Sequence, residues 1–335
     1  MKLLLTGSTG FVGRNLLLEL LKRKTYETIY LPIRNESKFR EQLKSEGISE
    51  FPRELNILRM EAPFWDFSQI KEIEHVVHSA GVLSGNSLED YSKTNTEGTL
   101  RLMRTLSRPQ RMVILSSQAA SGPCGDNQVC KTEEDQDSPI TWYGASKLEM
   151  ENQVRKEFSD REYVFLRPPM ILGPRDTATL PLFKMAGGFV QVKPGFKTKE
   201  YSFVAVNDLV QAILRVLESS TDLRNLRQRK FFVASDQTIT DTELITTATA
   251  VMNRSSRLVK IPQPVIWGLS QVVGNIPALS KAIPNLSKDR AREIWPDKWV
   301  VSAKNFEMTF GWEAKISLKT SLKETFDWYK KFGQL

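Results

Sequence analysis

Short apolar runs alternate along the chain with segments of helical periodicity. Buried strands typically span about four to eight residues, whereas apolar residues that recur every three or four positions mark one face of a helix. The runs that predict strands lie at 1–5, 28–34, 55–61, 74–81, 111–117 and 161–174. The helical patterns lie at 14–24, 37–47 and 88–107, and a further helix is expected from Trp142. This alternation predicts an α/β fold built on a parallel sheet.

In the second half of the chain, a short strand followed by a helix is expected over 201–218, with Asn207 or Asp208 as the helix cap. Another strand is expected over 229–235, and an amphipathic helix ends the chain. The stretch 261–280 has no charged residue, but prolines and polar amides interrupt it, so it does not predict a transmembrane helix. It is interpreted as an apolar lid or helix pair over a substrate pocket. Flanking lysines and arginines leave peripheral membrane contact as an alternative.

A glycine-rich turn, TGSTGFVG at 6–13, joins the first strand to the first helix. Gly7 allows a tight turn, Gly10 admits the pyrophosphate of a dinucleotide, and Gly13 lets the helix pack closely on the strand. Unpaired N–H groups at a helix N-terminus bind phosphates. Small residues at the end of the fourth strand would let the cofactor pass over it. The cofactor-binding residues expected in these two loops are Gly7, Thr9, Gly10, Phe11, Val12, Gly13, Ser79, Ala80 and Gly81.

The residue that ends the second strand bears on the choice of cofactor. Rossmann proteins that select NAD usually place Asp or Glu there, about 20 residues past the glycines, to bind the ribose hydroxyls. This chain has Arg34, with Lys38 and Arg40 nearby. A guanidinium pairs bidentately with a 2′-phosphate, so Arg34 predicts NADP as the cofactor. The neighbouring Glu36 lies close enough to this position that NAD remains the alternative cofactor.

Three side chains form the candidate catalytic set. Ser117 ends the fifth strand, at the edge where open α/β sheets place their chemistry. Tyr143 and Lys147 stand four residues apart in a predicted helix and therefore share one face. An ammonium beside a phenol lowers the phenol pKa from about 10, so Tyr143 is expected to exchange a proton with a substrate hydroxyl. Ser117 would hydrogen-bond the same oxygen. Pro168, in the proline-rich exit of the sixth strand, is expected beside the nicotinamide.

The composition disfavours several other functions. Two cysteines make neither a disulfide framework nor a zinc site, and two histidines nearly exclude histidine-based metal or triad chemistry, so no metal is expected. The net charge of +8 is spread along the chain without a dense basic run, which argues against nucleic acid and for an anionic cofactor or substrate. The low cysteine count and the absence of an apolar leader before Thr6 predict a cytoplasmic protein.

These features together predict a Rossmann-type doubly wound parallel sheet with a smaller, mostly helical C-terminal substrate domain. The expected dinucleotide-binding domain covers 1–170, with 201–235 returning to it. The expected substrate-binding domain covers 171–200 and 236–335.

The order of the motifs resembles the extended short-chain dehydrogenase/reductase superfamily, in particular its NAD-dependent epimerase/dehydratase branch, over nearly the whole chain. The similar segments are TGSTGFVG at 6–13, HSAG at 78–81, NTEGT at 95–99, LSSQAASGP at 115–123, YGASK at 143–147, LRPPMILGP at 166–174, FVAVNDLV at 203–210 and FGWEAKISLKTSLKETFDWY at 310–329. The resemblance implies that Ser117, Tyr143 and Lys147 are catalytic. It also implies that Asn95 supports Lys147 through a water molecule. A homodimer paired through the helices at 88–107 and 143–158 is a further implication.

Two departures from this pattern narrow the expected reaction. Nucleotide-sugar dehydratases place acidic residues directly after the catalytic Ser or Thr, whereas Gln118 and Ala119 stand there in this chain, which disfavours dehydration. Ala205 occupies a position where the family often has histidine. Arg34 and the apolar stretch 261–280 resemble the branch of dihydroflavonol reductases, hydroxysteroid dehydrogenases and hopanoid-associated epimerase-like proteins. Those proteins act on bulky, fairly apolar alcohols or ketones.

The expected function is therefore NADP-preferring oxidoreduction of a secondary alcohol or ketone of a bulky small molecule. A nucleotide-sugar epimerase that holds NAD tightly is the alternative. A dinucleotide-sensing module without turnover is a third reading, but a sensor has no need of the catalytic set. No nucleic acid and no integral membrane segment are expected.

Overall fold

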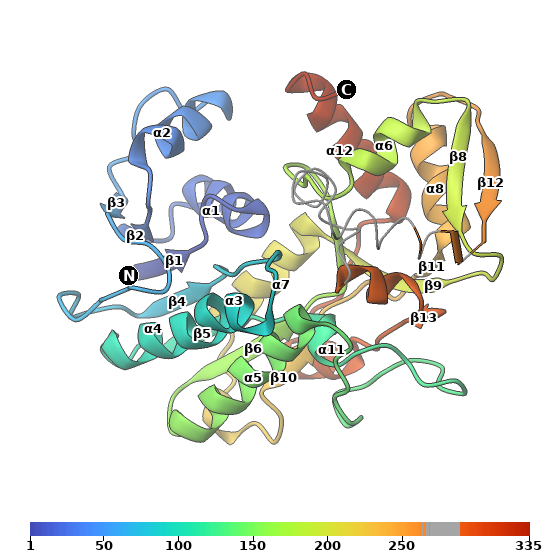
Figure 1. Ribbon diagram of the computed structural model, residues 1–335. Coiled ribbons are helices and arrows are strands. Elements are labelled where there is room, and N and C mark those ends of the chain that lie inside the picture. Colours follow the sequence, from blue (N-terminus) through green and yellow to red (C-terminus); the bar gives the residue numbers. More distant parts are fainter. Residues whose placement is uncertain (263, 266–267, 269–288) are drawn as a thin grey trace.

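The computed structural model of the protein describes residues 1–262, 264–265, 268 and 289–335. Its largest sheet has seven parallel strands in the spatial order β10-β6-β5-β4-β1-β2-β3 (Figure 1). These strands are β1 Lys2–Thr6, β2 Thr28–Pro32, β3 Leu55–Leu58, β4 His75–His78, β5 Arg111–Leu115, β6 Tyr163–Arg167 and β10 Lys230–Phe232. The strand order reverses between β1 and β4, and such sheets bind their ligands at the carboxyl ends of the strands beside this reversal. The predicted α/β fold with a parallel sheet is confirmed.

Helices cover both faces of this sheet because its strands are apolar on both sides. Leu3 and Leu5 of β1 belong to one core cluster, whereas Leu4 belongs to the other. The first cluster receives α1 Phe11–Arg23, α2 Glu36–Ser45 and α7 Val206–Glu218. The second receives α4 Thr99–Thr105 and α5 Trp142–Glu157. Each strand therefore contributes alternate residues to two separate cores.

The helix predicted at 88–107 consists of three connected pieces. They are α3 Leu88–Ser92, a π-helix over Lys93–Gly98, and α4. Asn95 and Gly98, the two poor helix formers within the predicted helix, both lie in the π-helix. Turns of this kind are rare and occur frequently at functional sites.

The other elements form two small sheets and their covering helices, on the right in Figure 1. In the first, β9 Glu200–Ala205 pairs with β7 Met170–Leu172, β11 Thr238–Thr240 and β13 Lys298–Trp299. In the second, β8 Val190–Pro194 pairs with β12 Arg257–Ile261. The helices are α6 Leu180–Ala186, α8 Asp241–Val251 and α12 Leu318–Lys331, whereas α11 Lys304–Phe310 packs against β10 of the large sheet. The sequence pattern did not indicate these small sheets.

The segment 201–235, which was expected to return to the dinucleotide-binding domain, contributes elements to two sheets. Helix α7 packs against α1 and β5, and β10 is the edge strand of the large sheet. Strand β9 instead lies in the four-stranded sheet. The chain thus passes from the small sheet to the large one at the junction of β9 and α7.

The predicted cap of α7 is wrong. Ala205 is the N-cap residue, and Asp208 lies inside the first turn. The Asp208 carboxylate accepts the backbone N–H groups of Lys315 at 3.0 Å and Ile316 at 2.8 Å. A carboxylate that binds the backbone of a distant segment cannot be told from a helix cap by its place in the sequence.

Among the residues that the structure describes, no helix has both the length and the apolar character needed to cross a bilayer. Most of the apolar stretch 261–280 lies outside those residues.

Candidate active site

The glycine-rich turn lies between β1 and α1, against the end of β4. Gly7 has a φ of +74°, and a Cβ there would stand 2.6 Å from the Ala80 nitrogen. A Cβ on Gly13 would lie 2.2 Å from the Gly7 carbonyl oxygen. Both positions therefore require glycine, the first for its backbone conformation as well as for space.

The N-terminus of α1 offers a site for an anion. Gly10 is the N-cap residue, so no side chain caps the helix, and the first turn holds no acidic residue. Thr9 and Gly10 are exposed at the tip of the turn, and Phe11 and Val12 are half-buried. Helix N-termini bind phosphates through their N–H groups and the helix dipole. The turn thus fits the pyrophosphate of a dinucleotide.

The end of β4 is tied to β1 by polar side chains. Ser79 Oγ donates to the Thr6 carbonyl at 2.7 Å, and the Ala80 N–H donates to Thr6 Oγ1 at 3.3 Å. The His78 ring lies 2.7 Å from Thr6 Oγ1 through Nδ1 and 2.8 Å from Thr99 Oγ1 through Nε2. Burial, with a smaller effect of the Lys147 charge, lowers the pKa of His78 to about 3. His78 is therefore a packing residue whose imidazole is neutral at working pH.

Gly81, Asn95 and Lys147 come together from three separate segments. A Cβ on Gly81 would lie 3.0 Å from Asn95 Oδ1 and 3.3 Å from Lys147 Nζ. Asn95 accepts the Val82 N–H at 2.9 Å and donates to the Val82 carbonyl at 3.3 Å. The π-helix thereby fixes the loop after β4, which lies between the glycine turn and Lys147 of α5.

Tyr143 and Lys147 lie in the first two turns of α5. Tyr143 is 8% exposed and clusters with Tyr91 and Ala119, and the two tyrosine ring centroids are 6.1 Å apart. Lys147 Nζ donates to the carbonyl of Leu115, the last residue of β5, at 2.9 Å. The ammonium is therefore held at the carboxyl end of the sheet, one helical turn from the phenol.

Ser117 lies two residues beyond β5, where Oγ accepts the Ala119 N–H at 3.1 Å. Gly144 packs directly on this turn, because a Cβ there would stand 2.3 Å from the Ala119 carbonyl oxygen. The Pro168 carbonyl accepts the Gln118 N–H at 3.0 Å. The predicted serine, tyrosine and proline segments are thus in contact through the short helix at Gln118–Ala120.

A buried ion network under α5 escaped the sequence analysis. Glu151 accepts a hydrogen bond from Ser116 Oγ at 2.5 Å and pairs with Arg167 at 2.6 Å. Arg167 also pairs with Asp137 at 2.6 Å. Removing one partner from such a buried network leaves an uncompensated charge, so the network locks β5, β6 and α5 together. The four-residue spacing of Tyr143, Lys147 and Glu151 places Glu151 on the same helix face, but it does not indicate the partners Arg167 and Asp137.

Burial makes the Lys147 ammonium unfavourable. It lowers the pKa of Lys147 from 10.5 to about 8, and the negative charge of Glu151 opposes the shift. Lys147 therefore titrates close to working pH, as catalytic lysines in perturbed environments often do.

A second group that sequence reasoning missed binds the start of α5. Both oxygens of Asp289 accept the Trp142 N–H, at 3.1 and 3.0 Å. Thr141, the N-cap of α5, donates from Oγ1 to Glu293 at 3.1 Å and accepts the Gly144 N–H at 3.2 Å. Two carboxylates from the C-terminal part of the chain thus face the positive end of the helix that carries Tyr143.

Arg34 lies two residues beyond the end of β2 and is exposed, with Nε 3.9 Å from Glu61 Oε2. Glu36, which had left NAD open, pairs with Arg40 at 2.7 Å and with Arg59 at 3.1 Å. Its carboxylate is therefore engaged by two guanidinium groups of the chain. The arrangement presents positive charge at the carboxyl end of β2.

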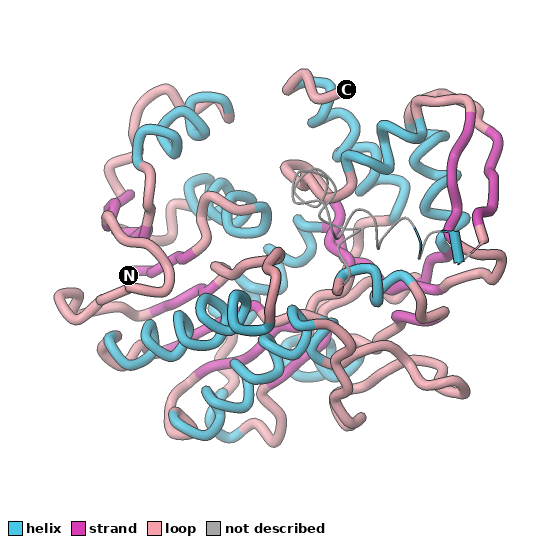
Figure 2. Tube along the Cα trace, viewed as in Figure 1, coloured by secondary structure: helices cyan, strands magenta, loops and turns pink. Residues whose placement is uncertain are grey.

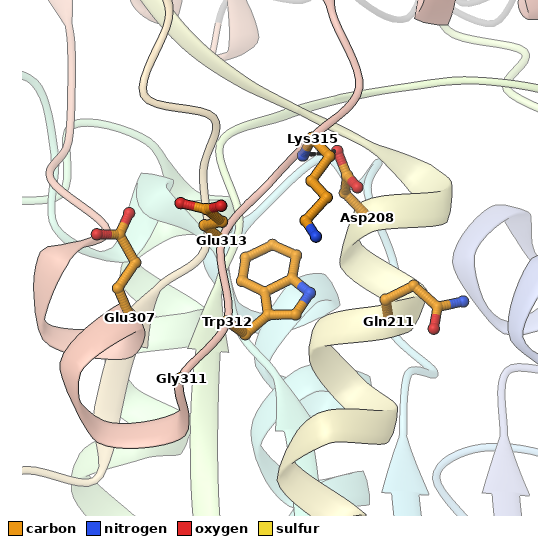
Figure 3. Close-up of a pocket in the computed structure, with 7 residues that line it drawn as sticks. All are labelled: Asp208, Gln211, Glu307, Gly311, Trp312, Glu313 and Lys315. Carbon is orange, nitrogen blue, oxygen red and sulfur yellow. Dashed lines mark hydrogen bonds between the residues drawn. The ribbon is translucent and has the colours of Figure 1, made fainter.

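A pocket of about 550 Å³ lies elsewhere, between α7 and the segment that follows α11. Figure 3 shows Trp312 and Lys315 on one side and Asp208 and Gln211 of α7 on the other. Its lining includes the carboxylates of Asp208, Glu307 and Glu313. This charge repels an anionic dinucleotide, so the pocket is unsuited to the cofactor. The described residues contain no cluster of three or more potential metal ligands.

The fold and the glycine turn define an α/β protein with a dinucleotide-binding site. The sequence model of the NAD dependent epimerase/dehydratase family matches residues 3–227, about two thirds of the chain, and the chain belongs to this family. It is thus an NAD(P)-dependent oxidoreductase of the extended short-chain dehydrogenase/reductase type.

Named relatives cover almost the full chain. A ceramide reductase of Caulobacter vibrioides is 26% identical over 99% of this chain and 95% of its own length. A UDP-glucose 4-epimerase of Vibrio cholerae is 25% identical over 96% of this chain and 94% of its own length. Among solved structures, UDP-glucuronic acid 4-epimerase of Bacillus cereus in complex with NAD superposes with a TM-score of 0.77 at 17% identity, over 99% of both chains. A UDP-glucose 4-epimerase of Thermotoga maritima has a TM-score of 0.74 at 20% identity, over 99% of both chains.

Proposed function

We propose that the protein is an NADP-preferring oxidoreductase that interconverts a secondary alcohol and a ketone on a bulky, apolar substrate. The observation that carries this proposal is the buried ammonium of Lys147. It lies one helical turn from Tyr143 and next to Gly81, in the loop that the glycine turn contacts. A binding module has no use for a buried charge beside a phenol, whereas proton transfer requires one.

The chain's own residues supply the proton transfer. When bound, the nicotinamide supplies or accepts a hydride at the substrate carbon. In the reducing direction Tyr143 donates its proton to the substrate oxygen, and Lys147 stabilises the phenolate that remains. Ser117 Oγ accepts a hydrogen bond from Ala119 and would donate its own proton to the same substrate oxygen. Asn95 holds the Gly81 loop against Lys147 through its bonds to Val82.

The surroundings of Tyr143 support an apolar substrate. Tyr91 and Ala119 pack with it, and Val82 and Trp142 border the same cluster. The relative named ceramide reductase acts, by its name, on a lipid. We therefore propose a ketone or secondary alcohol of a lipid-like molecule as the substrate class.

Two features support NADP. Arg34 places an exposed guanidinium at the end of β2, and Glu36 is paired with arginines of the chain. The B. cereus neighbour was solved with NAD, so NAD is the competing cofactor.

A nucleotide-sugar epimerase is the second candidate. It is favoured by the V. cholerae relative and by the epimerase neighbours. Such an enzyme oxidises and re-reduces its substrate on one cofactor molecule. A non-catalytic dinucleotide sensor is the weakest reading.

We further propose that the protein is a cytoplasmic homodimer. Cys124 and Cys130 are both free thiols, which suits a reducing compartment. The resemblance to the superfamily implies pairing through the helices at 88–107 and 143–158. Light scattering in dilute buffer tests the dimer, and a monomeric mass would exclude it.

The decisive experiment follows NADPH absorbance while the protein is offered long-chain keto lipids in micelles, steroid ketones and UDP-sugars. We expect oxidation of NADPH with an apolar ketone, and we expect Tyr143→Phe to lower kcat roughly 10²–10⁴-fold while NADPH still binds. Tyr30→Phe, on a half-buried strand residue outside the site, is the matched control and should keep full activity. Interconversion of UDP-sugars without net loss of NADPH would establish the epimerase instead.

A further inference from the structure

The two-stranded sheet of β8 and β12 reverses the usual distribution of polar and apolar side chains. Gln191 and Lys193 of β8 point inward and are 2% and 1% exposed. Gln191 Nε2 donates to Ser256 Oγ at 2.7 Å, and Lys193 pairs with Asp241 at the start of α8. Helices α6 and α8 contact this side of β8, and the strand pair lies at the right-hand rim of the molecule (Figure 2). The covered side of the sheet is therefore polar.

The uncovered side is apolar. Alternate residues of a strand share a face, and the parallel register places Val259 opposite Val192. Val190 is 51% exposed and Val259 45%. Phe189, which precedes β8, is 92% exposed, and Phe196, which follows it, is 65% exposed. We call this surface the outer face; apart from Arg257, which the register places opposite Val190, it is apolar and consists of Phe189, Val190, Val192, Phe196, Val259 and Ile261. Contiguous exposed apolar surface on a folded protein marks an interaction site.

Positive charge predominates around the outer face. The segments 182–199 and 244–262 contain seven lysines and arginines and no aspartate or glutamate. Five of these are exposed: Lys184, Lys197, Arg254, Arg257 and Lys260. Lys197 also pairs with Asp297 at 3.0 Å. An apolar surface with a basic rim is complementary to a surface that is apolar within and anionic outside.

We propose that the outer face docks the protein peripherally on an anionic lipid bilayer. Phe189 and Phe196 enter the boundary between headgroups and acyl chains, and the basic residues lie over anionic headgroups. A second copy of the chain fits this face less well, because a two-fold contact would set one basic surface against an identical basic surface. This inference concerns a surface outside the active site and does not depend on the proposed reaction.

Vesicle sedimentation tests the proposal without any substrate. The purified protein is mixed with vesicles of phosphatidylcholine alone, or with about one third phosphatidylglycerol, at low and high salt. We expect binding to the anionic vesicles, weak binding to neutral ones, and release as salt screens the charges. Protein that stays in the supernatant with both vesicle types would overturn the proposal.

Two double variants separate the contributions. Phe189→Ser with Phe196→Ser should weaken binding tenfold or more, because two exposed aromatic side chains no longer insert. Arg257→Gln with Lys260→Gln should weaken it by roughly fivefold per charge. The controls are Met308→Ser, which removes an 80% exposed apolar side chain elsewhere, and Lys71→Gln with Lys304→Gln, which makes the same change in net charge. Neither control should change binding.

The same variants test whether a second copy of the chain, and not a membrane, covers the outer face. If the phenylalanine variant loses a dimer in light scattering and binds vesicles as well as the wild type, the outer face is an interface between copies and the membrane proposal is wrong. Equal thermal melts and equal NADPH affinity confirm that each variant is folded.

Discussion

At the scale of single residues, the buried ammonium of Lys147 in the candidate active site lowers the stability of the folded state. Its ammonium is nearly excluded from water, and burial lowers its pKa from 10.5 to about 8. Holding this charge in the folded state costs on the order of 3 kcal/mol relative to the unfolded chain. The fold tolerates that cost at the position where the proposed proton transfer would use a cation beside Tyr143.

Lys147→Met should therefore stabilise the protein by up to a few kcal/mol while it abolishes turnover and weakens cofactor binding. Below about pH 8 the lysine is protonated in both states, and its unfavourable contribution is constant. Between pH 8 and 10.5 the unfolded state binds more protons, so wild-type stability rises with pH through this group. Urea unfolding at several pH values should show that rise for the wild type and its loss in the variant. A variant that is less stable than the wild type at pH 7 would contradict this account.

Arg34 is the residue on which cofactor choice is expected to depend. Arg34→Asp removes a partner for the 2′-phosphate and adds an acceptor for ribose hydroxyls. The loss of one charge-assisted pair should weaken NADPH binding by roughly 1.5–3 kcal/mol, tenfold or more, and move preference toward NAD. Titration with both dinucleotides measures the change. Arg53→Asp is the control, because Arg53 precedes β3 and therefore lies at the amino end of the strand next to β2, away from the carboxyl ends of the sheet. Equal wild-type affinities for the two cofactors would remove the basis of this assignment.

At the scale of elements, His78 joins β1, β4 and the end of the π-helix. Thr99 Oγ1 donates its own proton to the Asn95 carbonyl, so it accepts from Nε2–H of His78, and Nδ1 of the neutral ring accepts from Thr6 Oγ1. The π-helix and the end of β4 therefore share a buried polar contact in which a charged ring is unfavourable.

Acid should consequently loosen this junction. The pKa of His78 is about 3 in the folded protein against an ordinary value near 6.5. Below pH 6.5 the unfolded state binds the extra proton, so stability falls with decreasing pH, by about 1 kcal/mol or more between pH 6.5 and 5. Denaturant unfolding over this range should give a steeper pH dependence for the wild type than for His78→Gln. Identical slopes would show that His78 does not titrate on unfolding.

At the scale of the whole molecule, cofactor exchange separates the two candidate functions. A reductase must release its cofactor in every turnover, whereas an epimerase would strand an oxidised intermediate if it did so. We expect the protein to purify largely free of dinucleotide and to bind NADPH at micromolar strength, about −8 kcal/mol. Denaturing the purified protein and assaying the supernatant for nicotinamide measures this. Release of stoichiometric NAD would favour the epimerase.

The sequence alone determined the large sheet and the identity of the candidate site residues. Period-two and period-3.6 patterns are local, and so are the glycine turn at 6–13 and the spacing of Tyr143 and Lys147. Features of this kind can be predicted from the sequence, because backbone conformation and helix faces depend on residues that are close together in the chain.

Only the tertiary structure decided which distant groups meet. Asp208 reads as a helix cap, yet it binds the backbone at Lys315 and Ile316. Arg167 and Glu151 look like ordinary charged residues until β6 and α5 bring them together. The inward polar face of β8 could be recognised only once β12 and α8 were placed against it. Contacts between segments far apart in the chain depend on how whole elements pack, and no local pattern records them.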